Sequence, residues 1–96
     1  MAVEHMVWMK FRPGVSDAQI QQHLKALAGL AGTVPGIASL RLGKNFTDRS
    51  GGYTHGMIVT FASRKELDAY LPHPQHQAVA GPLKRDADLL VMDFEW

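Results

Sequence analysis

The alternation of apolar and polar residues predicts a first β-strand at residues 3–11. This run ends at Arg12-Pro13-Gly14 and carries large apolar side chains at both its odd and its even positions. A strand with one buried face alternates apolar with polar residues instead. We therefore expect this strand to be covered on both sides, as in the centre of a sheet.

A helix is predicted to follow the first strand. Ser16-Asp17-Ala18-Gln19 matches a capping box, in which the serine and glutamine side chains satisfy each other's backbone donors. Steps of four, three and four residues then place one apolar stripe along the helix, formed by Ile20, Leu24, Leu27 and Ala31. Pro35-Gly36 cannot continue a helix, so the element ends before it.

Two further strands are expected in the middle of the chain. Residues 37–46 place Ala38, Leu40 and Leu42 on one side and small or polar residues on the other, which suits the edge of a sheet. Residues 47–52 have the composition of a turn. The strand at 53–61 has one face formed by Tyr53, His55, Met57, Val59 and Phe61.

The last third of the chain is predicted to hold short helices and a final strand. Ser63-Arg64-Lys65-Glu66 is a second candidate capping box, and the helix after it has one side formed by Leu67, Tyr70 and Leu71. Pro72 ends this helix, and Pro74 starts another turn or two that reach Val79. Gly81-Pro82 is expected to break that piece, and residues 88–96 form the last strand.

This order of elements, β-α-β-β-α-β, predicts an α+β protein of the ferredoxin-like class in one domain, residues 1–96. Its four-stranded antiparallel sheet has the first and third strands in the middle and both helices on one face. The uncovered face would expose apolar side chains such as Met6, Trp8 and Ile58, or the opposite set. Because such a patch is expected to be an interface, we predict a homodimer that closes an α+β barrel.

Composition and charge narrow the classes of function. The chain has 96 residues, a formal net charge of +1 and scattered basic residues, so we expect no nucleic-acid partner. It has no cysteine, which excludes disulfides and thiolate chemistry. No leader peptide and no apolar run of about 18 residues is apparent, so we expect a cytoplasmic protein without a membrane partner.

The candidate chemistry lies in the histidines. His5 and His55 occupy the two central strands among apolar neighbours, and the imidazoles would lie close together if these strands are adjacent and parallel. Histidine is suited to proton transfer near neutral pH. The alternative interpretation is that each is a buried histidine with a satisfied hydrogen bond.

Tyr70, His73 and His76 are spaced by three residues, although prolines interrupt the helix that would align them. His73 directly precedes a proline and is suited to cap a helix, whereas Tyr70 and His76 are expected to point inward. A phenol and a neutral imidazole beside His5 would make a proton-transfer pocket. His5, His73 and His76 would also supply three nitrogen ligands, but the carboxylate spacing does not support a metal site. Asp93 is interpreted as a polar position at the sheet edge.

The whole chain resembles the stress-responsive A/B barrel (Dabb) family over residues 3–96. A His-Pro-x-His cluster between two short helices is the most specific part of this resemblance. Four stretches carry it: residues 3–11, Val34-Pro35-Gly36-Ile37, Gly43-Lys44-Asn45-Phe46 leading to Gly52-Tyr53-Thr54-His55, and Tyr70-Leu71-Pro72-His73-Pro74-Gln75-His76.

The resemblance implies a homodimeric barrel with a small-molecule pocket, no cofactor and, in most members, no established reaction. Polyketide cyclases of the family imply that His76 is a general base, that Tyr70 polarises the substrate and that His5 bonds a substrate oxygen. Leu27 stands where those cyclases have a pocket tyrosine, and His55 and His73 are further pocket candidates. The ligand would then be a small aromatic or polyketide-like molecule. Oxidation of quinols or degradation of haem is supported by fold analogy alone.

Overall fold

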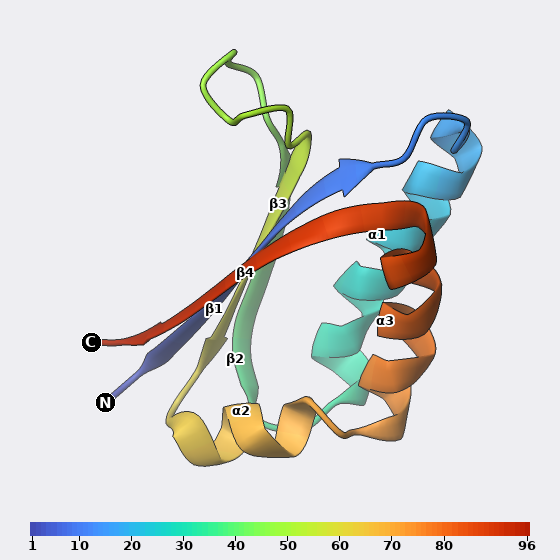
Figure 1. Cartoon of the computed structure of the whole chain (residues 1–96). Coiled ribbons are helices and arrows are strands. Elements are labelled where there is room, and N and C mark those ends of the chain that lie inside the picture. Colours follow the sequence, from blue (N-terminus) through green and yellow to red (C-terminus); the bar gives the residue numbers. More distant parts are fainter.

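The computed structural model describes all 96 residues and contains four strands and three helices (Figure 1). The strands form one sheet in the order β2-β3-β1-β4, and all three pairs are antiparallel. This confirms the predicted ferredoxin-like class. The elements are β1 (Val3–Phe11), α1 (Asp17–Thr33), β2 (Ile37–Lys44), β3 (His55–Phe61), α2 (Arg64–Tyr70), α3 (Pro74–Asp86) and β4 (Ala87–Glu95).

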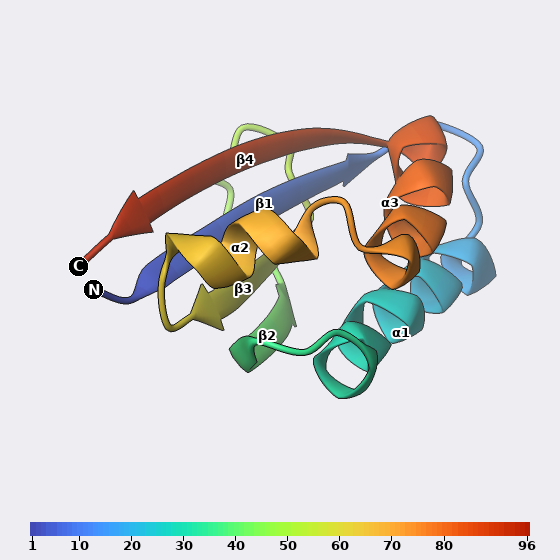
Figure 2. The same cartoon turned by 90° about the horizontal axis from the view of Figure 1, so that it is seen from below.

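The three helices cover one face of the sheet (Figure 2), as the strand pattern predicts. On β1 the odd positions from Val3 to Met9 are buried beneath the helices, and β3 buries its own odd positions in the same way. The opposite face has no helix. Its large apolar side chains are exposed, among them Trp8, Leu90, Met92 and Phe94.

Helix α1 begins as predicted, with both hydrogen bonds of the capping box at Ser16 and Gln19 present. Its buried stripe differs from the prediction at the C-terminal end, where Leu30 is buried and Ala31 is exposed. The step of three from Leu27 to Leu30 follows the 3.6-residue turn as well as a step of four does. The larger leucine therefore faces the core, since it removes more apolar surface from water.

Strand β2 lies at the sheet edge, as predicted, but its apolar face is different. The pairing with β3 shifts between Ile37 and Ser39, which makes Ala38 an extra residue and leaves it exposed. Such a bulge changes which side chains face the core. Ile37 therefore packs with Leu40 against the core in place of Ala38.

The connection between β2 and β3 is longer than the predicted turn and spans residues 45–54. It projects beyond the end of the sheet (Figure 1). Asn45 donates to the carbonyl of Thr47, the Ser50 hydroxyl donates to the carbonyl of Tyr53, and Gly51 and Gly52 have φ angles of 66° and 92°. These local bonds replace strand pairing, so the predicted strand ends at 46 and 53 are wrong.

Two predictions about the later helices are wrong. The hydroxyl of Ser63 donates to the carboxylate of Glu66 and makes no capping bond to α2. Helix α3 continues through Pro82 to Asp86 rather than breaking there. Proline removes one amide donor from a helix. Burial of Ala80 and Leu83 on either side holds the helix against the core despite that loss.

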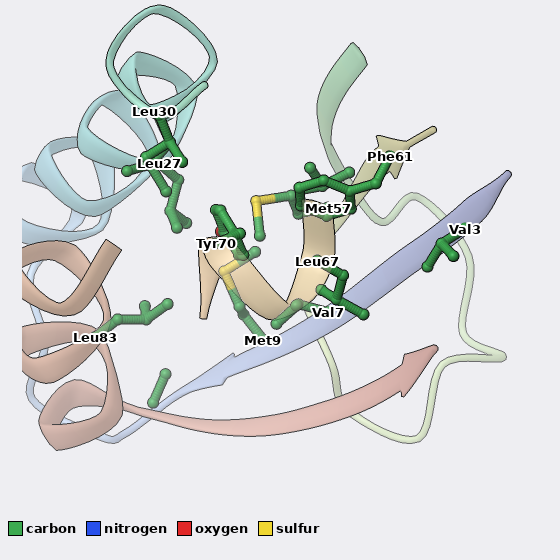
Figure 3. Packing of buried hydrophobic residues seen from close by; sticks show 13 residues of the cluster. Val3, Val7, Met9, Leu27, Leu30, Met57, Phe61, Leu67, Tyr70 and Leu83 are labelled. Atoms are coloured by element: carbon green, nitrogen blue, oxygen red, sulfur yellow. The ribbon is translucent and has the colours of Figure 1, made fainter. Parts of the chain in front are cut away.

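The centre of the core is Tyr70, the last residue of α2, which is fully buried (Figure 3). Side chains from α1, α3, β1 and β3 surround it, and they include Leu27, Leu83, Met9 and Met57. Leu71, predicted on the same side, is 39% exposed. A phenol at this position brings a polar group to a site that is otherwise apolar.

Candidate functional site

Tyr70 holds a buried hydroxyl that has no hydrogen-bond partner. Its ring centroid lies 4.2 Å from that of His76, 5.2 Å from that of Phe61 and 5.8 Å from that of His5. Burial raises the pKa of Tyr70 to about 12. The phenol is therefore neutral at physiological pH, and its proton is free to be donated in a hydrogen bond.

His76 lies in the first turn of α3, where His73 caps the helix and Pro74 occupies its first position. The Nδ1 atom of His76 is 2.8 Å from the carbonyl oxygen of Leu71. Since a carbonyl only accepts, Nδ1 carries the hydrogen and Nε2 is left as an acceptor.

The charge state of His76 follows from its surroundings. Burial is the largest effect and lowers its pKa; the bond to the Leu71 carbonyl opposes this, and nearby His5 lowers the pKa further. The imidazole is therefore neutral near pH 7. A neutral imidazole with a free Nε2 can accept a proton from a bound molecule.

His5 is buried on β1 and bonds across the sheet to Asp93. The two residues face one another in the β1–β4 register, and His5 Nδ1 lies 2.5 Å from an oxygen of Asp93. The carboxylate fixes the orientation of the ring, as in other His–carboxylate pairs. Asp93 does lie on an edge strand, but the sequence interpretation missed this partner. The pairing of Asp93 with His5 follows from the antiparallel register of β1 with β4. The spacing of residues within a single strand does not show it.

The structure thus brings together His5, Tyr70 and His76, the three residues predicted to act in catalysis. The three further candidates for the pocket, His55, His73 and Leu27, have other surroundings. His73 is a helix cap whose Nδ1 accepts from the backbone N–H of Gln75, as its alternative interpretation predicts. Leu27 is part of the core cluster that contains Tyr70.

His55 lies away from His5. The two central strands are antiparallel rather than parallel, so His55 faces Met9, four positions along β1 from His5. The predicted closeness of the two imidazoles is therefore wrong. His55 Nδ1 lies 2.8 Å from the Thr54 hydroxyl, and its pKa is lowered, first by burial and then by the charge of Lys44.

A second polar cluster, not predicted from the sequence, surrounds Phe11 at the other end of β1. The ring of Phe11 stacks on His23 at 5.8 Å and meets the edge of His55 at 5.7 Å. His23 on α1 in turn bonds Asp86 at the end of α3, with 2.7 Å between Nε2 and the carboxylate oxygen. This pair ties the two helices together.

None of the three candidate catalytic residues lines the surface hollow on the uncovered face of the sheet. That hollow holds about 660 Å³ and lies on the uncovered face, where Trp8, Tyr53 and Ile58 contribute to its wall. The site around Tyr70 is closed, since the hydroxyl has almost no contact with solvent.

No group of three histidine or carboxylate side chains is arranged to hold a metal ion. The combination of His5, His73 and His76 is not assembled, because His73 bonds its own helix. None of the helices is both long and apolar enough to cross a membrane. The groups that this site supplies itself are the imidazoles of His5 and His76 and the phenol of Tyr70.

Several known proteins are similar to this chain in sequence and in structure. The chain is 33% identical over 78 residues to olivetolic acid cyclase of Cannabis sativa, covering 79% of this chain and 77% of that protein. It is 29% identical over 96 residues to a stress-response A/B barrel domain-containing protein of Arabidopsis thaliana, covering 97% and 88%. A dimeric ferredoxin-like protein of unknown function from Jannaschia sp. has a TM-score of 0.87 at 31% identity, with 100% of both chains covered. The model of the stress responsive A/B barrel domain matches residues 3–96, and the chain belongs to this Dabb family.

Proposed function

We propose that this Dabb protein is a homodimer that binds a small carbonyl compound at Tyr70 and catalyses ring closure as a polyketide cyclase does. The observation that carries the proposal is the hydroxyl of Tyr70, which is buried without a hydrogen-bond partner on a ring that lies near the imidazoles of His5 and His76. An unpaired buried hydroxyl costs stability. A bound carbonyl oxygen would accept its hydrogen and remove that cost. The similarity to olivetolic acid cyclase supports a substrate of the polyketide class.

The roles follow from the protonation states. His76, neutral and with Nε2 free, takes a proton from a methylene carbon between two carbonyls. The carbanion forms a carbon–carbon bond to another carbonyl carbon farther along the same molecule. The oxygen of that carbonyl becomes an alkoxide. The Tyr70 hydroxyl donates a hydrogen bond to that oxygen. The protonated His76 then returns the proton to the alkoxide, and loss of water from the ring completes the reaction.

His5 and Asp93 act together on the other side of Tyr70. With Nδ1 donating to Asp93, the Nε2 atom of His5 is free to bond a substrate oxygen. Asp93 touches no substrate in this assignment and serves as a positioning residue for the His5 ring.

The homodimer is supported by the uncovered sheet face. Met92 is 64% exposed, Leu90 51% and Trp8 42%, and together these side chains form a contiguous apolar surface along β1 and β4. Apolar surfaces of this kind mark interaction sites. The Jannaschia protein, which matches the full length of this chain, is dimeric. Sedimentation at micromolar concentration is expected to give a dimer, and a monomer would contradict this part of the proposal.

A small-molecule binder without catalysis is the second candidate, and one experiment separates the two. The wild type, His76→Ala and His73→Asn are each given a linear poly-β-keto thioester, and the ring-closed aromatic product is measured by mass spectrometry. We expect His76→Ala to slow product formation by about 10²–10⁴-fold, the typical contribution of a general base. His73→Asn is the matched control, because asparagine also caps a helix.

Binding is measured in parallel with olivetolic acid as the probe, by calorimetry on the same three proteins. Binding without product in the wild type would contradict the enzyme and leave the binder. Equal rates in the wild type and His76→Ala would contradict the role of His76 as the base.

A further inference from the structure

The carbonyl group of Leu71 lies at the junction of the two helices that carry Tyr70 and His76. Helix α2 ends at Tyr70, and Leu71 is its C-terminal cap. Helix α3 begins at Pro74, so only two residues separate the cap from the next helix. The position of this carbonyl therefore affects how the phenol and the imidazole face each other.

The Leu71 oxygen lacks the backbone partner that a continuous helix would provide. That partner would be the N–H four residues later, in Gln75. The Gln75 N–H instead donates to the ring of His73, with 3.1 Å between the two nitrogens. Pro72 and Pro74 have no N–H to offer. The last carbonyls of a helix then depend on other donors, such as side chains.

Two side chains of α3 donate to the Leu71 oxygen. His76 Nδ1 lies 2.8 Å from it, and Gln77 Nε2 lies 2.7 Å from it. A carbonyl oxygen has two lone pairs, so it can accept both hydrogens. The backbone N–H of Gln77 also donates to the carbonyl of His73. Gln77 is thus tied to the segment between the helices at two points, once through its backbone and once through its amide.

The bond between His76 and Leu71 determines the tautomer of the imidazole. With the hydrogen on Nδ1, Nε2 is an acceptor, whereas the other tautomer has no acceptor at Nε2. Leu71 is 39% exposed, so water can compete for its oxygen unless protein donors hold the carbonyl in place. A general base at His76 therefore requires this carbonyl to keep its orientation.

We propose that Gln77 is a positioning residue for the general base, in the catalysis on which this inference rests. Its amide holds the Leu71 carbonyl where His76 can donate to it, so that Nε2 of His76 stays free. Gln77 is exposed and touches no substrate in this assignment. Its removal should therefore change the imidazole without changing the core.

The charge of His76 provides a second measure of the same bond. Burial is the largest effect and lowers the pKa of His76, whereas the bond to the Leu71 carbonyl raises it. Three nearby basic side chains lower the pKa further, those of His5, Lys84 and His73. Gln77 has no charge, so it acts on this balance only through the carbonyl. If the carbonyl moves, the pKa of His76 should fall further.

The test replaces Gln77 by methionine, which keeps the length of the side chain and removes its donors. Gln75→Met is the matched control, because Gln75 is also exposed in the first turn of α3 and bonds there through its backbone N–H. Gln77→Lys returns a donor to the position. NMR of the free proteins, with heavy nitrogen in their histidines, reports which ring nitrogen of His76 carries the hydrogen. His76→Asn identifies the signals.

We expect Gln77→Met to shift the tautomer ratio of His76 about three- to tenfold away from the Nδ1–H form, the worth of one ordinary hydrogen bond. Gln75→Met should match the wild type, and Gln77→Lys should restore the ratio. An unchanged ratio in Gln77→Met, or an equal shift in Gln75→Met, would overturn the proposal. A shift towards the Nδ1–H form would also overturn it, because Gln77 would then compete with His76 for the oxygen.

The product assay measures the consequence for catalysis. In Gln77→Met, kcat should fall about three- to tenfold with KM unchanged, and the acid limb of the pH profile should move to lower pH. A normal kcat and pH profile despite a shifted tautomer would overturn the catalytic part of the assignment. If the wild type forms no ring-closed product, the proposed function fails, whereas the tautomer ratios of the free proteins still test the role of Gln77.

Discussion

Histidines and aromatic rings lie at both ends of the protein interior, but only one end holds a buried polar group without a hydrogen-bond partner. His5 and Phe11 lie six positions apart on β1, about 20 Å at the usual rise of a strand. At the Phe11 end, His23 bonds Asp86 and His55 bonds Thr54, and both rings contact the phenylalanine. At the His5 end, the ring of Tyr70 lies near two imidazoles, and its hydroxyl bonds neither of them.

This difference indicates that the Phe11 end of the core has a structural role and that the His5 end has a functional one. Buried polar groups are nearly always hydrogen-bonded, and a group that is not calls for an explanation. The paired His23 and Asp86 hold α1 against α3 and need no ligand to explain them. The Tyr70 hydroxyl costs stability in the free protein, which is understandable if a ligand supplies the missing partner. Removing a polar group should therefore have opposite effects on stability at the two ends.

Among the variants that compare the two ends of the core, the largest effect is expected from Tyr70→Phe. Loss of a single donor to a developing oxyanion typically slows a reaction by about 10²–10³-fold, and we expect this loss in ring closure. The free protein should be as stable as the wild type, or more stable by up to about 1 kcal/mol, because no hydrogen bond is lost. Chemical denaturation and the product assay measure the two quantities. A clear loss of stability would show that the hydroxyl has a partner in the free protein, and Tyr53→Phe outside the site is the control.

The next largest effect is a loss of stability expected at the Phe11 end of the core. Asp86→Ala leaves the half-buried His23 without its partner, which should lower the free energy of unfolding by about 1–2 kcal/mol. Asp88→Ala removes an ion pair between two exposed side chains, Asp88 and Arg12, and should cost less than about 1 kcal/mol. Urea denaturation measures both. If Asp86→Ala were as stable as the wild type, the contrast between a structural and a functional end would fail.

Much of the fold could be predicted from the sequence, because the signals are local. Alternation along β1 and β3 identifies which positions are buried, and the capping box at Ser16 identifies where α1 begins. The errors occur where tertiary packing overrides a local preference. Helix α3 passes through Pro82 because Leu83 is buried, and Ala38 is exposed because β2 is bulged against β3.

The candidate site could be predicted only in part from the sequence. His5, Tyr70 and His76 were singled out through spacing and family resemblance, and the structure brings them together. Asp93 and the pair of His23 with Asp86 depend on contacts between residues more than sixty positions apart. Only the order and direction of the strands and the packing of the helices determine those contacts. The same cause explains why His55 was wrongly placed beside His5.

The smallest expected effect is the pH dependence of the free energy of unfolding, to which histidines at both ends of the core contribute. The pKa values of His55 and His76 are lowered in the folded protein, mainly by burial. The unfolded chain therefore binds protons more readily than the folded one below the usual histidine pKa of about 6.5. Their contribution to stability is present above that pH and is lost as the pH falls further, so the free energy of unfolding should decrease between pH 7 and pH 5.

His55→Asn should make this decrease shallower, because one of the two groups no longer titrates, whatever its effect on stability at pH 7. His76→Asn should do the same from the other end, and the double variant should show the weakest dependence. Denaturation curves at matched ionic strength measure the slopes. A bound carbonyl ligand leaves the Phe11 end untouched, so it should alter the slope of His55→Asn, which retains His76, and not that of His76→Asn. The same change in both variants would place the ligand away from Tyr70.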